Sequence, residues 1–321
     1  MTDIKKQPVI VVCGPTASGK TALAIELAKS FDGEIISADS MQIYEGLDIA
    51  TAKPTLEEMQ GIPHHLLSFV PMNKGFSVAD YVCAAKEKIS EVANRGKIPI
   101  IAGGTGLYIN SLIDNVNFDN AVTDGKVRER LMSEVEMNGP EKMHNRLMEI
   151  DPKTALDVSP NNIIRVIRAL EIFEITGFKF SDYKEMNKGK NSPYNACMIG
   201  LNFEDRQNLY DRIDKRVDIM IENGMLEECR EVFLNEQLNT ACQAIGYKEL
   251  VPFFRGEEEL LSCISKIKQN SRRYAKRQLT WFRRDDRINW IYLGNIISFE
   301  KILDSAKKIV AKSEIICYNT K

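Results

Sequence analysis

One octapeptide near the start of the chain has the composition and spacing of a phosphate-binding loop. Residues 14–21 read GPTASGKT and match the pattern G-x-x-x-x-G-K-[ST] in full. Gly14 and Gly19 allow a tight turn, Lys20 adds a positive charge, and the hydroxyl of Thr21 can bind Mg²⁺. A buried apolar run precedes the loop and a segment with helical spacing follows it, which is the context that this motif requires. The sequence therefore predicts a P-loop.

The ligand of this P-loop is indicated by what is missing from a neighbouring segment. Most P-loop enzymes bind ATP or GTP and hold Mg²⁺ with a carboxylate at the end of another strand. The best candidate strand, 98–102 (IPIIA), runs instead into the glycine-rich segment 103–106 (GGTG). This pattern favours a diphosphate held as a leaving group over an ATPase, although Asp39 could still serve a metal.

Asp39 follows a second apolar strand, 34–38 (EIISA), and opens the segment DSMQIY. If that strand neighbours the first, its carboxyl end places Asp39 near the P-loop. The carboxylate could then accept a proton from a nucleophile, while Ser40 and Gln42 hydrogen-bond the edge of a planar base. A cap on the following turn is an equally good interpretation, because Asp often has that part after a strand.

Two further signals have ordinary interpretations beside the functional ones. His64 and His65 could bind a metal or act as a base, but their position between Pro63 and Leu66 favours packed, hydrogen-bonded histidines. Lys53 is either a solvated charge or a substrate contact, and its neighbours in the sequence do not distinguish these.

A strongly basic segment lies late in the chain. Residues 266–287 contain nine Lys or Arg against two Asp, a net charge of +7 in a chain whose net charge is -2. Aromatic side chains are interleaved with these charges, which favours contact with nucleic acid over a solvated helix face. Arg165 and Arg168 share one face of another helix and could form a second phosphate contact or an exposed stripe.

The elements that position these residues belong to two parts of the chain. Strand-like runs at 8–13, 34–38, 98–102, 198–202 and 288–293 alternate with helical segments, which predicts a doubly wound parallel α/β sheet. Between them lie helical patterns without strand-like runs. We therefore expect a P-loop core at 1–114 and 196–321, and a helical insertion domain at 115–195.

Composition excludes several classes of protein. The chain is 44% hydrophobic and 27% charged, as is usual for soluble proteins. Its seven cysteines form no C-x-x-C pair, which argues against a zinc site or a disulfide framework. No run of 18 apolar residues and no signal-peptide pattern occurs, so we expect a cytoplasmic protein without a membrane contact.

Eight segments together resemble the bacterial tRNA dimethylallyltransferase (tRNA isopentenyltransferase) family over residues 8–293. They are GPTASGKT, DSMQIYEGLDIATAKP, GIPHHLL, FSVADY, GGTGLYI, NNIIRVIRALEIFEITG, ACQAIGYKEL and RRYAKRQLTWFRRD. The resemblance implies transfer of a dimethylallyl group from dimethylallyl diphosphate to the exocyclic amine of the adenosine 3′ of the anticodon. It also implies Mg²⁺, release of diphosphate, and an insertion domain that contacts the tRNA anticodon stem-loop. We expect a monomer.

The resemblance also implies a part for individual residues. The implied catalytic residues are Asp39 as general base, Lys20 and Thr105. The implied diphosphate ligands are Gly14, Thr16, Ala17, Ser18, Gly19, Lys20, Thr21 and either Arg212 or Arg216, with Thr21 also binding the metal. The implied tRNA contacts are Asp39, Ser40, Met41, Gln42, Thr105, Ile164, Arg165, Val166, Ile167, Arg168, Gln243, Gly246, Tyr247, Lys248, Lys276, Arg277, Gln278, Trp281 and Arg283.

Three rival functions use the same motifs. A P-loop kinase would use the loop and Asp39 equally well, but it leaves the insertion and the basic segment unexplained. An ATP-driven or non-catalytic RNA-binding protein is disfavoured by the missing carboxylate after strand 98–102. A transferase that acts on free adenine nucleotides is the closest rival.

Overall fold

The computed structural model describes residues 6–118, 123–189, 191–234, 243–294, 298–313 and 315. The chain divides into two compact units. One unit comprises Met1–Ile113 and Ser192–Lys321, and the other comprises Asp114–Asn191. Cys242 and Cys317 lie outside the described residues, and the five described cysteines are free thiols.

A six-stranded sheet forms the centre of the first unit, and all of its strand pairs are parallel. Its strands, in chain order, are β1 (Gln7–Cys13), β2 (Gly33–Ser37), β3 (His64–His65), β4 (Ile98–Gly103), β5 (Tyr194–Phe203) and β6 (Ile288–Leu293). The spatial order is β3-β2-β4-β1-β5-β6. The expected doubly wound α/β fold is confirmed, and β3 is an additional strand that the sequence analysis did not predict.

The interpretation of Asp39 assumed that β2 lies next to β1, and the structure shows a different order. β2 does not neighbour β1, because β4 lies between them and pairs with both, Ala102 being the register partner of Val12 and of Ser37. The carboxyl ends of all three strands nevertheless meet at one edge of the sheet, as parallel pairing requires. Asp39 therefore reaches the P-loop across the end of β4.

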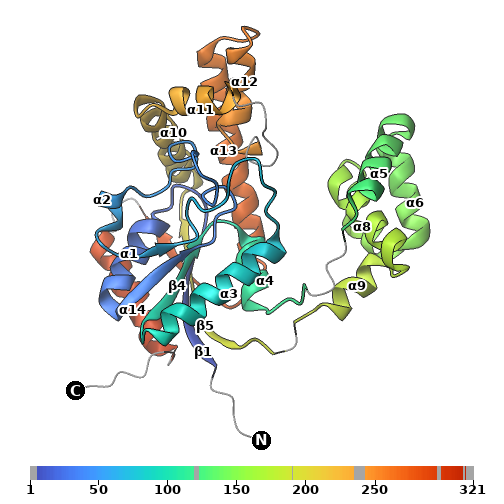
Figure 1. Ribbon diagram of the computed structural model, residues 1–321. Helices are drawn as coiled ribbons and strands as arrows, with labels where there is room; N and C mark the ends of the chain where they lie inside the picture. Colours follow the sequence, from blue (N-terminus) through green and yellow to red (C-terminus); the bar gives the residue numbers. More distant parts are fainter. Residues whose placement is uncertain are drawn as a thin grey trace, which may run out of the picture. The chain divides into compact units, whose positions relative to one another are not determined.

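Helices cover both faces of the sheet (Figure 1). One face packs against α1 (Lys20–Phe31) and α14 (Phe299–Lys312), and the other against α3 (Val78–Asn94) and α4 (Gly106–Ile113). Leu23 and Leu27 of α1 have no exposed surface and share an apolar cluster with Ile10, Ile199 and Val310. Fully burying a side chain of this kind typically stabilises a fold by about 1.5–3 kcal/mol. These contacts fix α1 and hence the P-loop at its start.

A second layer of helices extends from the carboxyl edge of the sheet (Figure 1). It consists of α10 (Arg206–Glu222), α11 (Met225–Leu234), α12 (Tyr247–Phe254) and α13 (Leu260–Phe282), while the short helix α2 (Leu56–Met59) belongs to the connection between β2 and β3. An apolar cluster that includes Tyr44, Val217, Met225 and Leu250 joins this layer to the loop after β2. The cluster brings α10 and α13 beside the loops that end β1, β2 and β4.

Every secondary-structure element among the described residues of the second unit is a helix. Its elements are α5 (Gly125–Asn138), α6 (Pro140–Ile150), α7 (Pro152–Asp157), α8 (Ile163–Thr176) and α9 (Phe180–Met186). It has its own apolar core, in which Leu131, Leu147 and Leu170 have no exposed surface. Glu171, also fully buried, forms ion pairs with Arg128 and Arg168.

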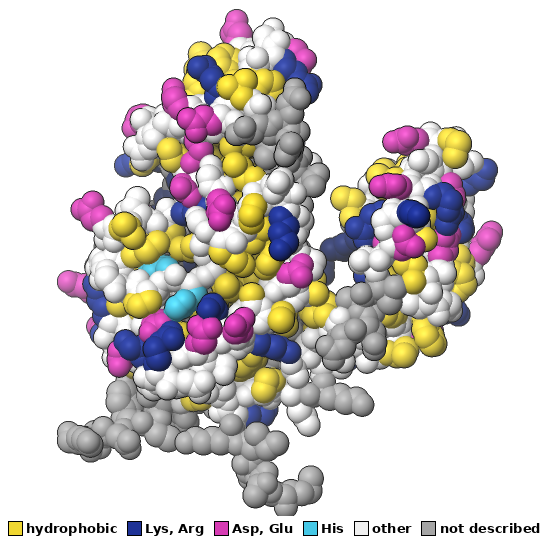
Figure 2. Space-filling model, viewed as in Figure 1, with side chains coloured by type: hydrophobic (Ala, Val, Ile, Leu, Met, Phe, Trp, Pro, Cys, Tyr) yellow, Lys and Arg dark blue, Asp and Glu magenta, His cyan; other side chains and the backbone are white. Residues whose placement is uncertain are grey.

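Charged side chains of both signs are mixed on the face shown in Figure 2, as the net charge of -2 leads one to expect. Among the helices that the structure describes, none has the length and apolar character needed to cross a membrane.

Candidate active site

The P-loop turns between β1 and α1 in the manner that the motif predicts. Gly14 and Gly19 have φ angles of 140° and 90°, where a Cβ atom is strained. A Cβ at Gly14 would also approach the carbonyl oxygen of Leu201 on β5 to 2.6 Å. The glycines are therefore required by the backbone path, and this path aims the first turn of α1 at a cavity.

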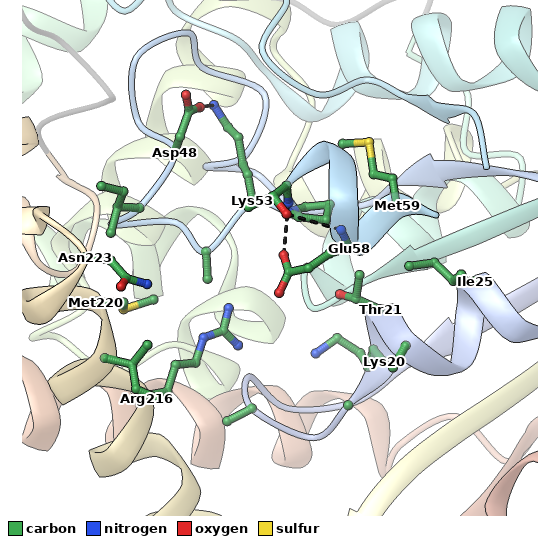
Figure 3. A pocket seen from close by; sticks show the side chains of 18 of the residues that line it. Lys20, Thr21, Ile25, Asp48, Lys53, Glu58, Met59, Arg216, Met220 and Asn223 are labelled. Atoms are coloured by element: carbon green, nitrogen blue, oxygen red, sulfur yellow. Dashed lines mark hydrogen bonds and ion pairs between the residues drawn. The ribbon is translucent and has the colours of Figure 1, made fainter. Parts of the chain in front are cut away.

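This cavity, which we call the outer cavity, has a volume of about 930 Å³. Its walls are the P-loop, the segment from Asp48 to Gln60, and α10. Figure 3 shows Lys20 and Thr21 pointing into it from α1 and Arg216 pointing into it from α10. Backbone N–H groups at a helix N-terminus and several cations surround one space, an arrangement that suits a polyanion.

Lys20 lies at the base of the outer cavity. Its Nζ atom donates to the carbonyl oxygen of Pro15 at 2.6 Å. Burial and the nearby charge of Arg216 lower the pKa of Lys20 to about 8, against opposing effects of Asp39 and Cys13. Burial thus disfavours the charged form of Lys20, and an anionic ligand beside it would raise its pKa again.

Two arginines one helical turn apart on α10 contact the P-loop. Arg212 donates from Nε to the carbonyl oxygen of Ala17 at 2.9 Å. Arg216 donates from Nη1 to the hydroxyl of Thr16 at 3.4 Å. Burial lowers the pKa of Arg216, and the charges of Asp39 and Glu58 oppose this shift. Arg212 lines only the outer cavity, whereas Arg216 also lines a second one.

The second space, the inner cavity, has a volume of about 220 Å³ and lies beside the outer cavity. Arg216 and Met220 line both, while Thr16, Asp39 and Ser40 line the inner cavity alone. Its remaining walls include Tyr274 and Arg277 of α13 and apolar side chains of α10. A phosphate-binding loop and a carboxylate therefore face a common boundary.

Asp39 both caps a turn and faces a cavity, the two alternatives that the sequence left open. Its Oδ1 atom accepts from the backbone N–H groups of Met41 at 2.9 Å and Gln42 at 3.4 Å, so it caps the turn. The same side chain also lines the inner cavity. Capping by one oxygen is compatible with proton transfer at the other.

Thr105 and Gln42 stabilise the loop that carries Asp39. The hydroxyl of Thr105 accepts from the backbone N–H of Ser40 at 3.0 Å. The amide of Gln42 donates to the carbonyl oxygens of Thr51 and Ala52 at 3.2 and 3.1 Å. Gln42 was expected to contact a base, but in this structure its amide is bonded to protein backbone.

The remaining signals of this region are structural. Lys53 donates to Tyr44, Asp48 and Ser68, so it braces the loop as well as lining the outer cavity. His65 bonds Glu34 at 2.7 Å, and His64 bonds the carbonyl oxygen of Ile62 at 2.8 Å. The histidines are packed and hydrogen-bonded, as expected. No group of three or more potential metal-ligating His, Cys, Asp or Glu residues occurs among the described residues.

Glu228 is a residue that the sequence analysis missed. From α11, its carboxylate accepts three consecutive backbone N–H groups, those of Asp48, Ile49 and Ala50, at 2.7–2.9 Å. Asp48 and Ile49 line the outer cavity, and Ala50 lines the inner cavity. A glutamate in an ordinary helix carries no sequence signal for this contact, because its partners lie about 180 residues away.

The basic segment falls mainly on α13, whose cations form two groups. Lys266, Lys268 and Arg272 form ion pairs with Glu258, Asp218 and Asp214. Arg273, Lys276 and Arg277 of the helix, and Arg283 and Arg284 just after it, are exposed and form no ion pair with another described residue. The part of the helix available to a polyanion is therefore its C-terminal end.

Two residues of this end have contacts inside the protein. Gln278 is 5% exposed and bonds the P-loop and the loop after β4. Trp281 is half-buried, donates from Nε1 to Asn110 at 3.2 Å, and lies so close to Gly106 that a Cβ there would overlap its ring. Both were expected to contact tRNA, and the structure places both in packing between helices and loops.

The other expected tRNA contacts vary in exposure. In the first unit, Gln243 and Lys248 are exposed and line the inner cavity. Gly246 and Tyr247 are buried and do not line it. In the second unit, Ile164 and Arg165 are exposed at the start of α8, whereas Val166 and Ile167 belong to its core and Arg168 pairs with Glu171.

Comparison with known proteins connects this geometry to a family. A family model described as IPP transferase matches residues 42–285. A protein named tRNA dimethylallyltransferase in Thermoanaerobacter sp. (strain X514) is 47% identical to this chain, and the match covers 94% of this chain and 97% of that protein. A protein of the same name in Bacillus subtilis (strain 168) is 48% identical, and the match covers 92% of this chain and 94% of that protein.

Solved structures agree with these relatives. The tRNA isopentenylpyrophosphate transferase of Bacillus halodurans is 42% identical with a TM-score of 0.72, covering 96% of this chain and 97% of that one. A eukaryotic dimethylallyltransferase acting on tRNA is 29% identical with a TM-score of 0.78, covering 95% and 80%. Sequence, fold and the paired cavities lead to one conclusion: this chain belongs to the IPP transferase family.

Proposed function

We propose that this protein transfers the dimethylallyl group of dimethylallyl diphosphate to the exocyclic amine of the adenosine 3′ of the anticodon in tRNA. The observation that supports this most strongly is the boundary between the two cavities. Arg216 lines both, with the P-loop on one side and Asp39 on the other. A diphosphate donor and a proton-losing acceptor would meet there, and the relatives' names describe such a reaction.

The outer cavity is suited to the diphosphate. The reaction breaks the bond between the allylic carbon and the diphosphate oxygen, and negative charge develops on that oxygen. The P-loop N–H groups, Lys20 and Arg216 are already directed at this region, so they stabilise the charge without rearrangement. We choose Arg216 over Arg212 as the principal arginine because Arg216 alone reaches both cavities.

Mg²⁺ fits this site through the hydroxyl of Thr21, which is exposed at the start of α1 and lines the outer cavity. Mg²⁺ commonly takes one or two protein ligands and completes its shell with phosphate oxygens and water. When bound, the ion would supply further positive charge to the leaving diphosphate. Thr21, Lys20 and the P-loop would hold the diphosphate in place.

Asp39 would accept the proton. As the exocyclic nitrogen forms its bond to the allylic carbon, it becomes positively charged, and one N–H proton passes to the Asp39 carboxylate. Diphosphate leaves with the electron pair of the broken C–O bond. An adenosine stacked in a loop must be extruded to reach the half-buried Asp39 carboxylate in the inner cavity, at a cost of a few kcal/mol that pocket contacts offset.

Two surfaces would hold the tRNA. The exposed cations Lys276, Arg277 and Arg283 on or beside α13 would contact phosphates near the inner cavity. In the helical insertion domain (115–195), the exposed Arg165 could contact phosphates, and the exposed Ile164 beside it could contact the RNA through its apolar side chain. We propose a cytoplasmic, monomeric enzyme, and light scattering coupled to size exclusion tests the monomer.

A transfer assay tests the function. Radiolabelled dimethylallyl diphosphate is incubated with the protein, Mg²⁺ and either an anticodon stem-loop bearing the adenosine or free AMP, and a gel shift reports RNA binding. Label in the stem-loop alone is expected. Label in AMP would indicate the free-nucleotide transferase, and phosphate transfer from ATP without prenyl transfer would indicate a kinase.

A further inference from the structure

Gln278 occupies an unusual position for a residue of a basic, nucleic-acid-facing helix. It is 5% exposed, and its Oε1 atom accepts the backbone N–H of Thr16 in the P-loop at 2.9 Å. Its Nε2 atom donates to the carbonyl oxygen of Gly104, after β4, at 3.0 Å. One side chain of α13 thus holds the ends of two neighbouring strands together.

The approach of Gln278 to these loops is close. A Cβ atom at Gly104 would overlap the Gln278 amide, so a larger residue here would displace that amide from its present position. The bond to Gly104 is buried and the bond to Thr16 is partly buried, so losing either would leave a backbone group with reduced access to water unsatisfied. The amide is therefore held in one orientation.

A network of neighbouring polar side chains extends from Gln278 to the loop that carries Asp39. Tyr274, one turn earlier on α13, lies close enough to the side chains of Gln278 and Thr105 for both to influence its pKa. Thr105 in turn accepts the backbone N–H of Ser40 at 3.0 Å. The network joins the diphosphate side of the site to the acceptor side, and α13 supplies its centre.

The same helical turn carries the cations proposed to bind tRNA. Lys276 and Arg277 precede Gln278 directly and are exposed, and Arg277 stacks over the ring of Tyr274. A helix moves as a rigid element, so any shift of these cations on binding phosphate also shifts Gln278. The P-loop N–H of Thr16 would move with it.

We propose that Gln278 is a positioning residue that couples tRNA binding on α13 to the geometry of the diphosphate site. This inference rests on the proposed function. Gln278 itself touches neither substrate. It acts through Thr16 and Gly104, so that the P-loop adopts its tightest diphosphate-binding geometry when the helix carries tRNA.

The test measures the coupling between two ligands. The dissociation constant of inorganic diphosphate, with Mg²⁺, is determined by calorimetry in the absence and presence of a saturating anticodon stem-loop. The variants are Gln278→Met, which removes both hydrogen bonds, and Gln278→Glu, which keeps only the acceptor. Gln269→Met is the matched control, since Gln269 is exposed on the same helix.

The native protein and Gln269→Met should bind diphosphate at least about fivefold more tightly with the stem-loop, the lower end of usual coupling. Gln278→Met should bring this ratio close to one, while stem-loop affinity without diphosphate changes by less than about twofold. Gln278→Glu should give an intermediate ratio, and it decides the question if Gln278→Met does not fold.

A purely structural glutamine would lower the melting temperature and leave the ratio intact, which would overturn the proposal. A native ratio of one would overturn it too. Failure of the native protein to bind the stem-loop would instead contradict the proposed function.

Discussion

At the scale of single residues, the chemistry depends on charges held close to the P-loop. Lys20 and Arg216 are near one another and partly buried. Burial is the main cause of the lowered pKa of each residue. Such cations gain most from a ligand that is itself highly charged. The site is thus adapted to a diphosphate more than to a neutral substrate.

Replacing Lys20 by Ala should reduce turnover about 10² to 10³-fold, because a preorganised charge at the leaving group is lost. Stem-loop binding should hardly change. In the native protein, diphosphate affinity should also fall as pH rises through about 8, where free Lys20 loses its proton. Lys20→Arg, which stays charged, should flatten this part of the pH profile measured by calorimetry. An equal pH profile in both proteins would contradict the position assigned to Lys20.

Asp39→Asn should separate the two parts of this side chain. The asparagine oxygen can still accept from Met41, so the turn and the melting temperature should be preserved. Loss of the proton acceptor should slow single-turnover transfer by about 10² to 10⁴-fold. Transfer at the native rate would mean that Asp39 is a cap alone.

At the scale of elements, α13 has ion-paired cations toward its N-terminus and, at its C-terminal end, cations that pair with no other described residue. Its N-terminal cations pair with acidic side chains, and two of these belong to α10, which also carries Arg216. These two pairs attach α13 to α10, which lines both cavities. The C-terminal end is left to carry charge toward a partner.

This division predicts the salt dependence of tRNA binding. Replacing Lys276 and Arg277 together by Ala should weaken binding and reduce the slope of log affinity against log salt by somewhat under one unit per lost contact. Lys266→Ala with Lys268→Ala removes the same charge from the paired half and should leave the slope nearly unchanged. Binding isotherms at three salt concentrations measure both, and equal slopes in the two double variants would exclude a selective contact.

Trp281 belongs to the contact between α13 and α4. Because it packs on Gly106 and bonds Asn110, Trp281→Ala should destabilise the fold by about 2 kcal/mol or more. At this size the melting temperature should fall by at least roughly 4 °C. Stem-loop affinity of the folded variant should change little. A loss of affinity with an unchanged melting temperature would instead indicate that the indole stacks on a nucleotide.

At the scale of the whole molecule, each unit has its own core, so acid should affect them differently. Burial would raise the pKa of Glu171, but hydrogen bonds and charges from Arg168 and Arg128 outweigh this and hold it below its usual value. A depressed carboxyl pKa stabilises the fold above the unfolded-state pKa, and this contribution is lost as pH falls through the folded-state pKa. The helical unit should therefore lose stability at acidic pH.

Glu171→Gln provides the comparison. It should lower the stability of the helical unit at pH 7, because two arginines lose their partner, and it should remove part of the decline below pH 4.5. Hydrogen exchange of residues 125–186, followed from pH 7 to pH 3, separates this unit from the sheet. The same acid-induced decline in both proteins would exclude Glu171 as its cause.

Local chemistry made much of this protein predictable. The P-loop needs only glycines, a lysine and a threonine at fixed spacing, and the buried strands read directly as apolar runs. Asp39 could be placed at a strand end, although its two parts could not be separated. The resemblance to a family added the reaction, because eight segments match it in order.

Only the tertiary structure decided which distant groups meet. The sequence could not show that β4 lies between β1 and β2, that Glu228 holds residues 48–50, or that Gln278 bonds the P-loop. Nor could it show that half of the cations of α13 are paired, or that Val166 and Ile167 are buried. A residue's type and spacing determine its local conformation and its possible bonds. The partner that satisfies those bonds depends on which elements pack together, and here many partners lie more than 150 residues away.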